Sequence, residues 1–329
     1  MSGEMAKNKA YSNNEKLSKK QFVSTYGSLI GLILLIIIIT VLRPRFISPA
    51  NLRNVFRNAS INGLLAIGMT FVVLTGGIDL SVGAIMGCAG MYSAYFAQSV
   101  KGYPAIVAIL IGLLVGLVFG VFNGFCIAYL KVPAFVGTLG ALSIADSLKF
   151  LLTDAKPIPN LSDSFKTIGG GSFGFIPIPC VIMAVVLIIC FTLLYKTRYG
   201  RYIYAVGGNR NAAHVSGINT KRIICSVYIL TGVLSALAGV IMTARVTSGV
   251  TSTGDGYETD AIAAVVVGGT SMAGGSGKIG GTIIGGLIIG VLNNGLNLLN
   301  VNSFWQYVVK GVVILLAVFL DYFRNKGKK

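Results

Sequence analysis

Charged residues are scarce in this sequence. Of its 329 residues, 11% are charged and 54% are hydrophobic, whereas a soluble globular chain carries about 25% charged residues. A soluble chain of this length needs a polar surface that this composition cannot supply. The scarcity therefore excludes an ordinary soluble protein and predicts a surface that faces lipid.

Acidic residues are the scarcer of the two charged types. Ten Asp and Glu stand against 27 Lys and Arg, which gives a net charge of +17. In a soluble protein this excess favours a nucleic-acid partner, but no stripe of basic and aromatic residues accompanies it here. The basic residues lie instead at the ends of apolar runs, the placement that orients membrane helices. We expect the lipid bilayer, and no nucleic acid, as a partner.

Groups for metal binding and catalysis are also few. His214 is the only histidine, and a single histidine without nearby Cys or carboxylate partners cannot build a zinc site. The cysteines lie scattered in apolar stretches with no metal-ligand spacing, at Cys88, Cys126, Cys180, Cys190 and Cys225. We expect no metal site, no disulfide and no catalytic residues, which makes a membrane enzyme the least favoured class.

One glycine-rich segment invites comparison with a nucleotide-binding loop. The segment Gly274–Lys278 ends in the Gly-Lys pair of a phosphate loop. That loop also requires glycine where Met272 stands and Ser or Thr where Ile279 stands. We interpret the segment as a turn between two membrane spans, so this chain is not expected to bind or hydrolyse ATP and carries no cofactor of its own.

Long apolar runs dominate the chain. A helix needs roughly 20 residues to cross the hydrocarbon core, and backbone groups in lipid must be satisfied within the segment. We predict helices near residues 22–42, 57–75, 80–98, 104–130, 134–152, 178–195, 222–245, 260–273, 279–299 and 305–322. The predicted fold class is all-α, a polytopic membrane protein with about ten transmembrane helices.

Charge places both termini in the cytoplasm. Residues 1–21 are polar and rich in lysine, and no small-residue cleavage site precedes or follows the run 22–42. We divide the chain into a cytoplasmic tail, 1–21, and a single transmembrane domain, 22–329. Ten spans put the tail, the basic loop 196–222 and the basic C-terminus on one side, as the positive-inside rule requires.

Three segments fall on the outside of this arrangement. The segment 43–57 carries four arginines, against the rule, and we predict that it forms a short surface helix. The long loops 153–177 and 246–259 are either a landing surface for an external partner or plain connections. Both readings of the loops stay open at this stage.

Glycine spacing predicts close helix packing. Glycines recur every four residues in the run 104–130, at Gly112, Gly116, Gly120 and Gly124. This spacing puts them on one helix face, where a neighbouring backbone can approach. A short internal repeat joins residues 72–77 to residues 265–270, and we name these the echo segments. The echo is typical of a transporter with two related halves, although so short a match also arises by chance.

Charges within or near the spans are candidates for function, because charge inside a bilayer is costly. They are Asp79, Asp146, Lys149, Arg245, Asp260 and Lys310. Most lie near enough to a predicted helix end to reach the interface. Asp79 follows two glycines that break a helix, so it is placed to cap the next helix. A role for its charge is the alternative.

The cytoplasmic loop 196–222 predicts a short helix. An apolar, strand-like stretch comes first, and Asn209 is then placed to cap a helix that Gly217 ends. We predict this helix over residues 208–218. A short, stiff helix on the cytoplasmic face suits the receipt of force from a soluble motor, although an ordinary surface helix has the same pattern.

These motifs together resemble a known family. They are LTGGIDLSVG at 74–83, GRYIYAVGGN at 200–209, SGI at 216–218, GYETDAIAAVVVGGT at 256–270 and LNNGLNLL at 292–299. The chain resembles the membrane permeases of bacterial ATP-binding-cassette (ABC) monosaccharide importers, and the ribose permeases most. The likeness covers nearly the whole chain after residue 22.

The resemblance implies partners and a location. It implies a homodimer of permease chains in the bacterial inner membrane, a separate cytoplasmic ABC ATPase that uses ATP and Mg, and an extracytoplasmic sugar-binding protein. The helix 208–218 is then the coupling helix that contacts the ATPase. Its implied coupling residues are Gly208, Asn209, Arg210, Asn211, Ala212, Ala213, His214, Ser216 and Gly217. Family members often have Glu beside the paired alanines, where this chain has Arg210 and Asn211.

The sugar and its path are harder to derive. Ribose fits the whole-chain likeness, while xylose, galactose and signalling-furanose permeases share the motifs. Our candidates for the translocation path are Asp79, Ser81, Asn293, Asn294 and Asn297. The asparagines have helical spacing, so they either line a polar path or bond to neighbouring helices. The alternative function is an ion-coupled carrier or channel, which needs acidic residues deep in the spans, and only Asp79 and Asp146 qualify.

Overall fold

The computed structural model describes residues 27–326. The predicted tail 1–21, the first residues of the predicted span 22–42 and the last three residues of the chain lie outside the described part. Within it the regular elements are helices and one small hairpin, and two isolated β-bridges join loop residues. The hairpin pairs β1 (Ser172–Phe173) antiparallel with β2 (Ile176–Pro177).

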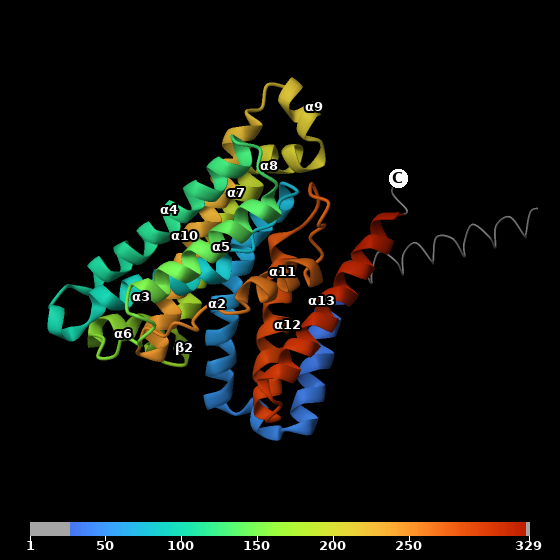
Figure 1. Ribbon diagram of the computed structural model, residues 1–329. Coiled ribbons are helices and arrows are strands. Elements are labelled where there is room, and N and C mark those ends of the chain that lie inside the picture. The colour runs from blue at the N-terminus through green and yellow to red at the C-terminus, as the bar shows by residue number, and fades with distance from the viewer. Residues whose placement is uncertain (1–26, 327–329) are drawn as a thin grey trace, which may run out of the picture.

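The helices follow one another with short connections (Figure 1). After a first helix, Gly27–Leu42, come η1 (Pro44–Ile47), α2 (Pro49–Leu74), α3 (Val82–Ala97), η2 (Ser99–Lys101), α4 (Ala105–Ala128), α5 (Ala134–Leu151), α6 (Asp163–Gly170), α7 (Ile178–Lys196), α8 (Arg198–Gly208), α9 (Arg210–Val215), α10 (Thr220–Val246), α11 (Tyr257–Val267), α12 (Ile279–Leu298) and α13 (Ser303–Lys326).

Six of the described helices are long and apolar enough to cross a membrane. They are α2, α4, α5, α7, α10 and α12, and three shorter apolar helices accompany them: Gly27–Leu42, α3 and Ser303–Leu316, the first part of α13. The prediction of an all-α, multi-pass membrane protein is confirmed.

The predicted span 260–273 is shorter than expected. The helix there, α11, has 11 residues and ends at Val267. At 1.5 Å per residue it is about 16 Å long, roughly half of the hydrocarbon core. Gly268 follows as the C-cap, and Gly269 then takes a positive φ of 85°, a conformation that turns the chain away from the helix.

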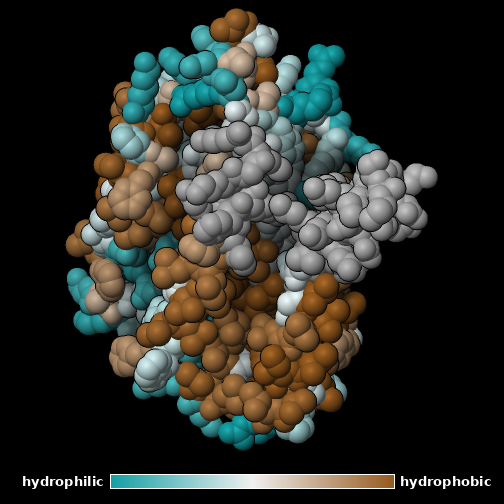
Figure 2. Space-filling view, turned by 90° about the vertical axis from the view of Figure 1, so that its right-hand side faces the viewer, coloured by the Kyte–Doolittle hydropathy of each residue, from teal (hydrophilic) through white to brown (hydrophobic). Residues whose placement is uncertain are grey.

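The core lies around α2 and α10. The apolar stretch of α2 is 89% buried and that of α10 is 61% buried, whereas those of α4, α5 and α7 are 17–28% buried. Large apolar side chains such as Phe122, Leu139 and Ile188 are exposed on these outer helices. Figure 2 shows a broad hydrophobic surface over the lower part of another face and hydrophilic side chains at its top. Exposed apolar area of this extent suits contact with lipid.

The glycine face of α4 packs against α10, as the spacing predicts. A Cβ atom at Gly116 would overlap the carbonyl oxygen of Gly232, and Gly120 and Gly124 approach the α10 backbone in the same way. Gly112 faces a side chain of α10, Val240. The two helices therefore touch through their backbones.

The segment 43–57 is not a separate surface helix, so that prediction is wrong. The segment begins with a single turn of 3₁₀ helix, η1. The long helix α2 then starts at Pro49 and includes the rest of the segment through residue 57. Ser48 is the N-cap of α2, and its Oγ accepts from the N–H of Asn51. A serine cap followed by proline at the first helical position is a strong helix start.

The echo segments share one local structure. In the first, the N–H of Gly77 bonds to the C=O of Val72 at 3.1 Å, and in the second the N–H of Thr270 bonds to the C=O of Val265 at 3.1 Å. A glycine with positive φ precedes the donor in each case. Both helices thus end in the same type of glycine turn, and the echo is structural as well as sequential.

Candidate functional site

Several loops meet at one end of the molecule, which we name the α8–α9 end. The helices α8 and α9 lie there, at the top of Figure 1. A cavity of about 1000 Å³ brings together Thr75–Gly77 after α2, Lys131–Ala134 between α4 and α5, and residues of α9 and α10. The loop after α11 also reaches this end, because Gly275 donates its N–H to the C=O of Leu74 at 2.9 Å.

The loop 196–222 forms two helices rather than a strand-like stretch and one helix. The stretch predicted to be extended is α8, which Thr197 caps by accepting from the N–H of Gly200. Ile203 and Val206 are buried on one face while its arginines are exposed. A spacing of three residues between buried positions is typical of a helix. The strand prediction was made because Tyr, Ile and Val are enriched in strands.

The short helix α9 has the predicted caps. Asn209 Oδ1 accepts from the N–H of Ala212 at 2.9 Å, and Gly217 takes a φ of +84° just after the helix. The helix spans Arg210–Val215, so it is shorter than the predicted 208–218 by two residues at its start and three at its end.

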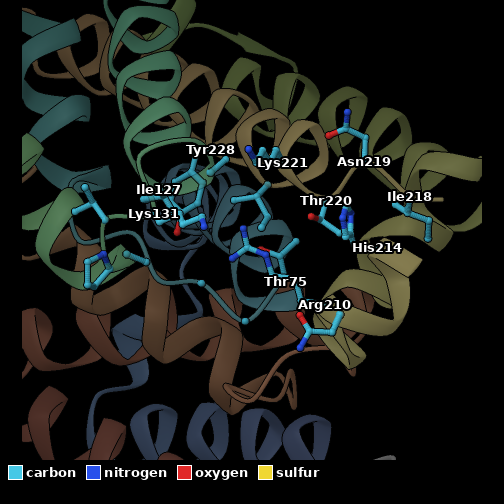
Figure 3. A pocket seen from close by; sticks show the side chains of 18 of the residues that line it. Thr75, Ile127, Lys131, Arg210, His214, Ile218, Asn219, Thr220, Lys221 and Tyr228 are labelled. Carbon is cyan, nitrogen blue, oxygen red and sulfur yellow. The ribbon is translucent and has the colours of Figure 1, made fainter. Parts of the chain in front are cut away.

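Most of the predicted coupling residues are exposed at the tip of this end. Of that set Ala213 alone is buried, at 5% exposure, while Val215 beside it is 88% exposed. Arg210 and His214 line the cavity together with Lys131 and Lys221 (Figure 3). Asn211 also belongs to the lining. No carboxylate belongs to its lining among the described residues. The cavity is therefore basic.

Asp79 and Ser81 lie together in a buried polar network. Both are fully buried, and the Ser81 N–H and Oγ–H both donate to Asp79 Oδ1, at 2.9 and 2.5 Å. Asn123 of α4 donates to Ser81 Oγ at 2.8 Å, and Tyr228 of α10 donates to the Ile78 carbonyl at 3.1 Å. The N-cap of α3 is Ser81 and not Asp79, so the predicted capping role is wrong. The Asp79 carboxylate instead holds the loop that enters α3, by accepting both hydrogen bonds from Ser81. Asn123 lies five residues before the end of α4, so the network is about 7.5 Å along that helix from its last residue.

The three asparagines of α12 bond to three neighbouring helices. Asn294 and Asn51 of α2 exchange two hydrogen bonds of 2.9 and 3.0 Å. Asn293 donates to Asp260 of α11 at 2.9 Å, and Asn297 accepts from Gln306 of α13 at 2.9 Å. Each interaction joins α12 to a neighbour. None of them connects α12 to the Asp79 network, so the two groups of path candidates are separate.

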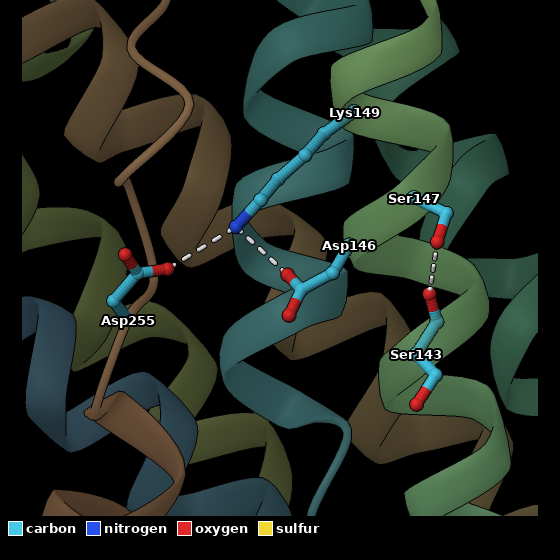
Figure 4. A network of polar contacts seen from close by, with 5 residues as sticks. All are labelled: Ser143, Asp146, Ser147, Lys149 and Asp255. Carbon is cyan, nitrogen blue, oxygen red and sulfur yellow. Dashed lines mark hydrogen bonds and ion pairs between the residues drawn. The ribbon is translucent and has the colours of Figure 1, made fainter. Parts of the chain in front are cut away.

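Several of the remaining intramembrane charges are paired. Lys310 and Asp260 form an ion pair of 2.9 Å between α13 and α11, with side-chain exposures of 16% and 5%. Lys149 of α5 is buried between Asp146 at 2.7 Å and Asp255 at 3.2 Å (Figure 4). Pairing offsets the cost of charge in a low-dielectric setting. The sequence does not show the two distant pairings, whose partners are 50 and 106 residues apart.

The start of α11 packs against the start of α3. A Cβ atom at Gly83 would overlap Gly254 and the Glu258 side chain, and one at Gly87 would overlap the Thr253 carbonyl. A second cavity of about 220 Å³ lies beside this contact, lined by Ala84, Leu142, Asp146, Gly254, Asp255, Gly256 and Glu258. Two interrupted segments of the chain therefore meet inside the bundle, an arrangement that transporters use around substrate.

Comparison with known proteins identifies the family. Residues 51–318 match the family model described as the branched-chain amino acid transport system permease component. The chain belongs to this permease family. No solved structure matches it.

Curated relatives of the permease cover most of the chain. The ribose import permease protein of Bacillus subtilis (strain 168) is 49% identical over 90% of this chain and 92% of its own length. That of Escherichia coli (strain K12) is 44% identical over 92% and 95%. The xylose transport system permease protein of Haemophilus influenzae is 35% identical over 85% and 91%. The chain is accordingly a multi-pass inner-membrane transport subunit and not an enzyme.

Sequence reasoning missed several residues of the permease that the structure brings to the sites. Lys131 lines the basic cavity, Asn123 and Tyr228 hold the Asp79 loop, and Tyr204 of α8 donates to the Gly277 carbonyl at 2.8 Å. Asn123 was the one with a usable signal, because an amide within an apolar helix requires a partner.

Proposed function

We propose that this permease forms the translocation pathway of an ABC importer for a monosaccharide, with D-ribose as substrate. The observation that carries the proposal is the 43–49% identity with ribose import permeases over nine tenths of the chain. Permeases named for xylose, D-allose and L-arabinose are 35–39% identical. Ribose is therefore favoured over these sugars.

The proposed topology has ten crossings and both termini in the cytoplasm. The tail 1–21 precedes a single transmembrane domain, 22–329, in this arrangement. Six long and three shorter apolar helices in the described part support nine crossings. The tenth consists of α11 together with the loop that precedes it. The basic residues of the α8–α9 end support its cytoplasmic location.

The proposed partners follow from the two ends of the molecule. A cytoplasmic ABC ATPase, which uses ATP and Mg, contacts α9 through exposed residues such as Arg210, His214 and Val215. An extracytoplasmic sugar-binding protein contacts the opposite end, near α6 and the β1–β2 hairpin. Two copies of the permease form the pore. Since Arg210 is an exposed cation at the start of α9, the receiving surface of the ATPase is expected to be acidic.

The proposed sugar path passes the Asp79–Ser81 network, which lies inside the bundle and next to the basic cavity. Asn293, Asn294 and Asn297 stay candidates for a path role beside their helix-to-helix bonds. An ion-coupled carrier is disfavoured, because of its two acidic candidates Asp146 is paired with Lys149 and Asp79 Oδ1 accepts two hydrogen bonds from Ser81.

Reconstitution of the transporter tests the proposal. The permease is expressed with a cytoplasmic ABC ATPase and an extracytoplasmic sugar-binding protein, and ATP hydrolysis is measured with ribose, xylose, allose and arabinose. We expect stimulation by ribose. Stimulation by another sugar and not by ribose would keep the ABC importer but assign that sugar as its substrate. Uptake that follows an ion gradient without an ATPase would refute the assignment to the ABC importers.

A further inference from the structure

The helix α8 connects α9 rigidly to the membrane bundle. Asn209 is the single residue between the two helices. Its N–H donates to the Ala205 carbonyl of α8 at 3.1 Å, and its Oδ1 accepts from the Ala212 N–H of α9 at 2.9 Å. Both helices thus share one residue as terminus and cap, so a displacement of α9 moves α8 with it.

Close to its C-terminal end, α8 packs against two loops that are hydrogen-bonded to each other, and we name this contact the glycine clasp. Here the Gly275 N–H donates to the Leu74 carbonyl at 2.9 Å, and the Gly207 backbone lies against that pair. A Cβ atom at Gly207 would overlap both the Leu74 oxygen and the Gly275 nitrogen. The Tyr204 hydroxyl completes the clasp by donating to the Gly277 carbonyl at 2.8 Å. Burial raises the pKa of Tyr204 above 10.0, its ordinary value, so the hydroxyl stays a donor.

The clasp connects the chain at the two echo segments, residues 72–77 and 265–270. Leu74 ends α2, and four residues later the chain reaches Ile78, whose carbonyl Tyr228 holds, and then Asp79. Gly275 and Gly277 belong to the segment between the second echo turn and α12. The α12 end of that segment is tied to α7, since the Ile279 N–H donates to the Tyr195 hydroxyl oxygen at 3.1 Å. One small helix therefore touches both loops that lead into the bundle.

We propose that Tyr204 and Gly207 are positioning residues that transmit movement of the α8–α9 segment to the loop 75–81 and to the loop 268–278. In this proposal the clasp makes the two loops move as one body, and the Asp79–Ser81 network moves with them. The inference rests on the proposed coupling to an ATPase and adds the residues through which that coupling reaches the path.

Two variants and two matched controls test the proposal in the reconstituted complex. Tyr204→Phe removes only the hydroxyl that bonds to Gly277, and its control is Tyr202→Phe, at an exposed tyrosine of the same helix. Gly207→Ala adds one methyl group inside the clasp. Its control is Gly280→Ala, where a Cβ meets nothing within 4 Å. Assembly, basal ATP hydrolysis, the KM for ATP, sugar-stimulated hydrolysis and sugar uptake are measured for each.

We expect Tyr204→Phe and Gly207→Ala to keep assembly and the KM for ATP, and to reduce sugar uptake per ATP hydrolysed by about tenfold. The controls should match the wild type. A merely structural role would lower assembly and every rate together, which would overturn the inference. If Gly207→Ala fails to assemble, Tyr204→Phe decides.

The wild-type complex separates this inference from the proposed function. A wild-type complex that no sugar stimulates refutes the proposed function, and the coupling role of Tyr204 and Gly207 with it. If a sugar stimulates the wild-type complex and Tyr204→Phe behaves like its control Tyr202→Phe, the positioning role is refuted and the proposed function stands.

Discussion

The Asp260–Lys310 pair allows a quantitative test of the packing of α11. The two charges are 2.9 Å apart, and at an effective dielectric of 20 their attraction is about 6 kcal/mol. Desolvation of each ion opposes this by several kcal/mol, so the pair has a small net effect when compared with two neutral residues. Loss of one partner is different, because it leaves the other charge buried and unpaired.

We expect Lys310→Met to lower the free energy of unfolding by about 3–5 kcal/mol. Asp260→Asn should be destabilising for the same reason, although it preserves shape. The double variant should cost no more than either single variant, because no unpaired charge is left. Unfolding by titration with a denaturing detergent in mixed micelles measures all three free energies.

The exposed pair of Lys166 and Asp163, 3.0 Å apart, provides the control. Lys166→Met should leave the unfolding transition unchanged, since exposed ion pairs contribute little. The contrary result is that the losses of unfolding free energy of the two single variants add up in the double variant to within about 0.5 kcal/mol. That result would show that the charges of Lys310 and Asp260 do not interact, and it would refute the ion pair.

Three further predictions concern helix packing, the Asp79 loop and α9. Gly116→Leu should prevent α4 from packing on α10 and lower the yield of monodisperse permease, whereas Gly140→Leu, at an open position of α5, should not; equal yields on size exclusion would contradict the backbone contact. Asp79→Asn should leave assembly intact, because Asn can accept the Ser81 hydrogen bonds; normal assembly with lost uptake would assign a role to the charge. Gly217→Val should strain the positive φ of 84° by about 1–2 kcal/mol and uncouple ATP hydrolysis from uptake, and coupling equal to wild type would count against α9 as the contact.

Local signals predicted well wherever a residue acts on its own neighbours. The two ends of α9 were predicted from Asn209 and Gly217, because capping and positive φ are properties of a few adjacent residues. The glycines of α4 were found from their spacing alone. The same local reasoning failed for α8, whose Tyr, Ile and Val favour a strand. There the burial of Ile203 and Val206 against the bundle decided for a helix.

The sequence by itself determined that this protein is an all-helical membrane protein with a basic, capped helix in its longest basic loop. Run length, composition and charge placement are additive along the chain, so they need no knowledge of which segments meet. Only the tertiary structure decided the pairings: Asp260 with Lys310, Asn294 with Asn51, and α8 with the turns that follow α2 and α11. These contacts join residues far apart in the chain, and their geometry depends on how the helices pack together.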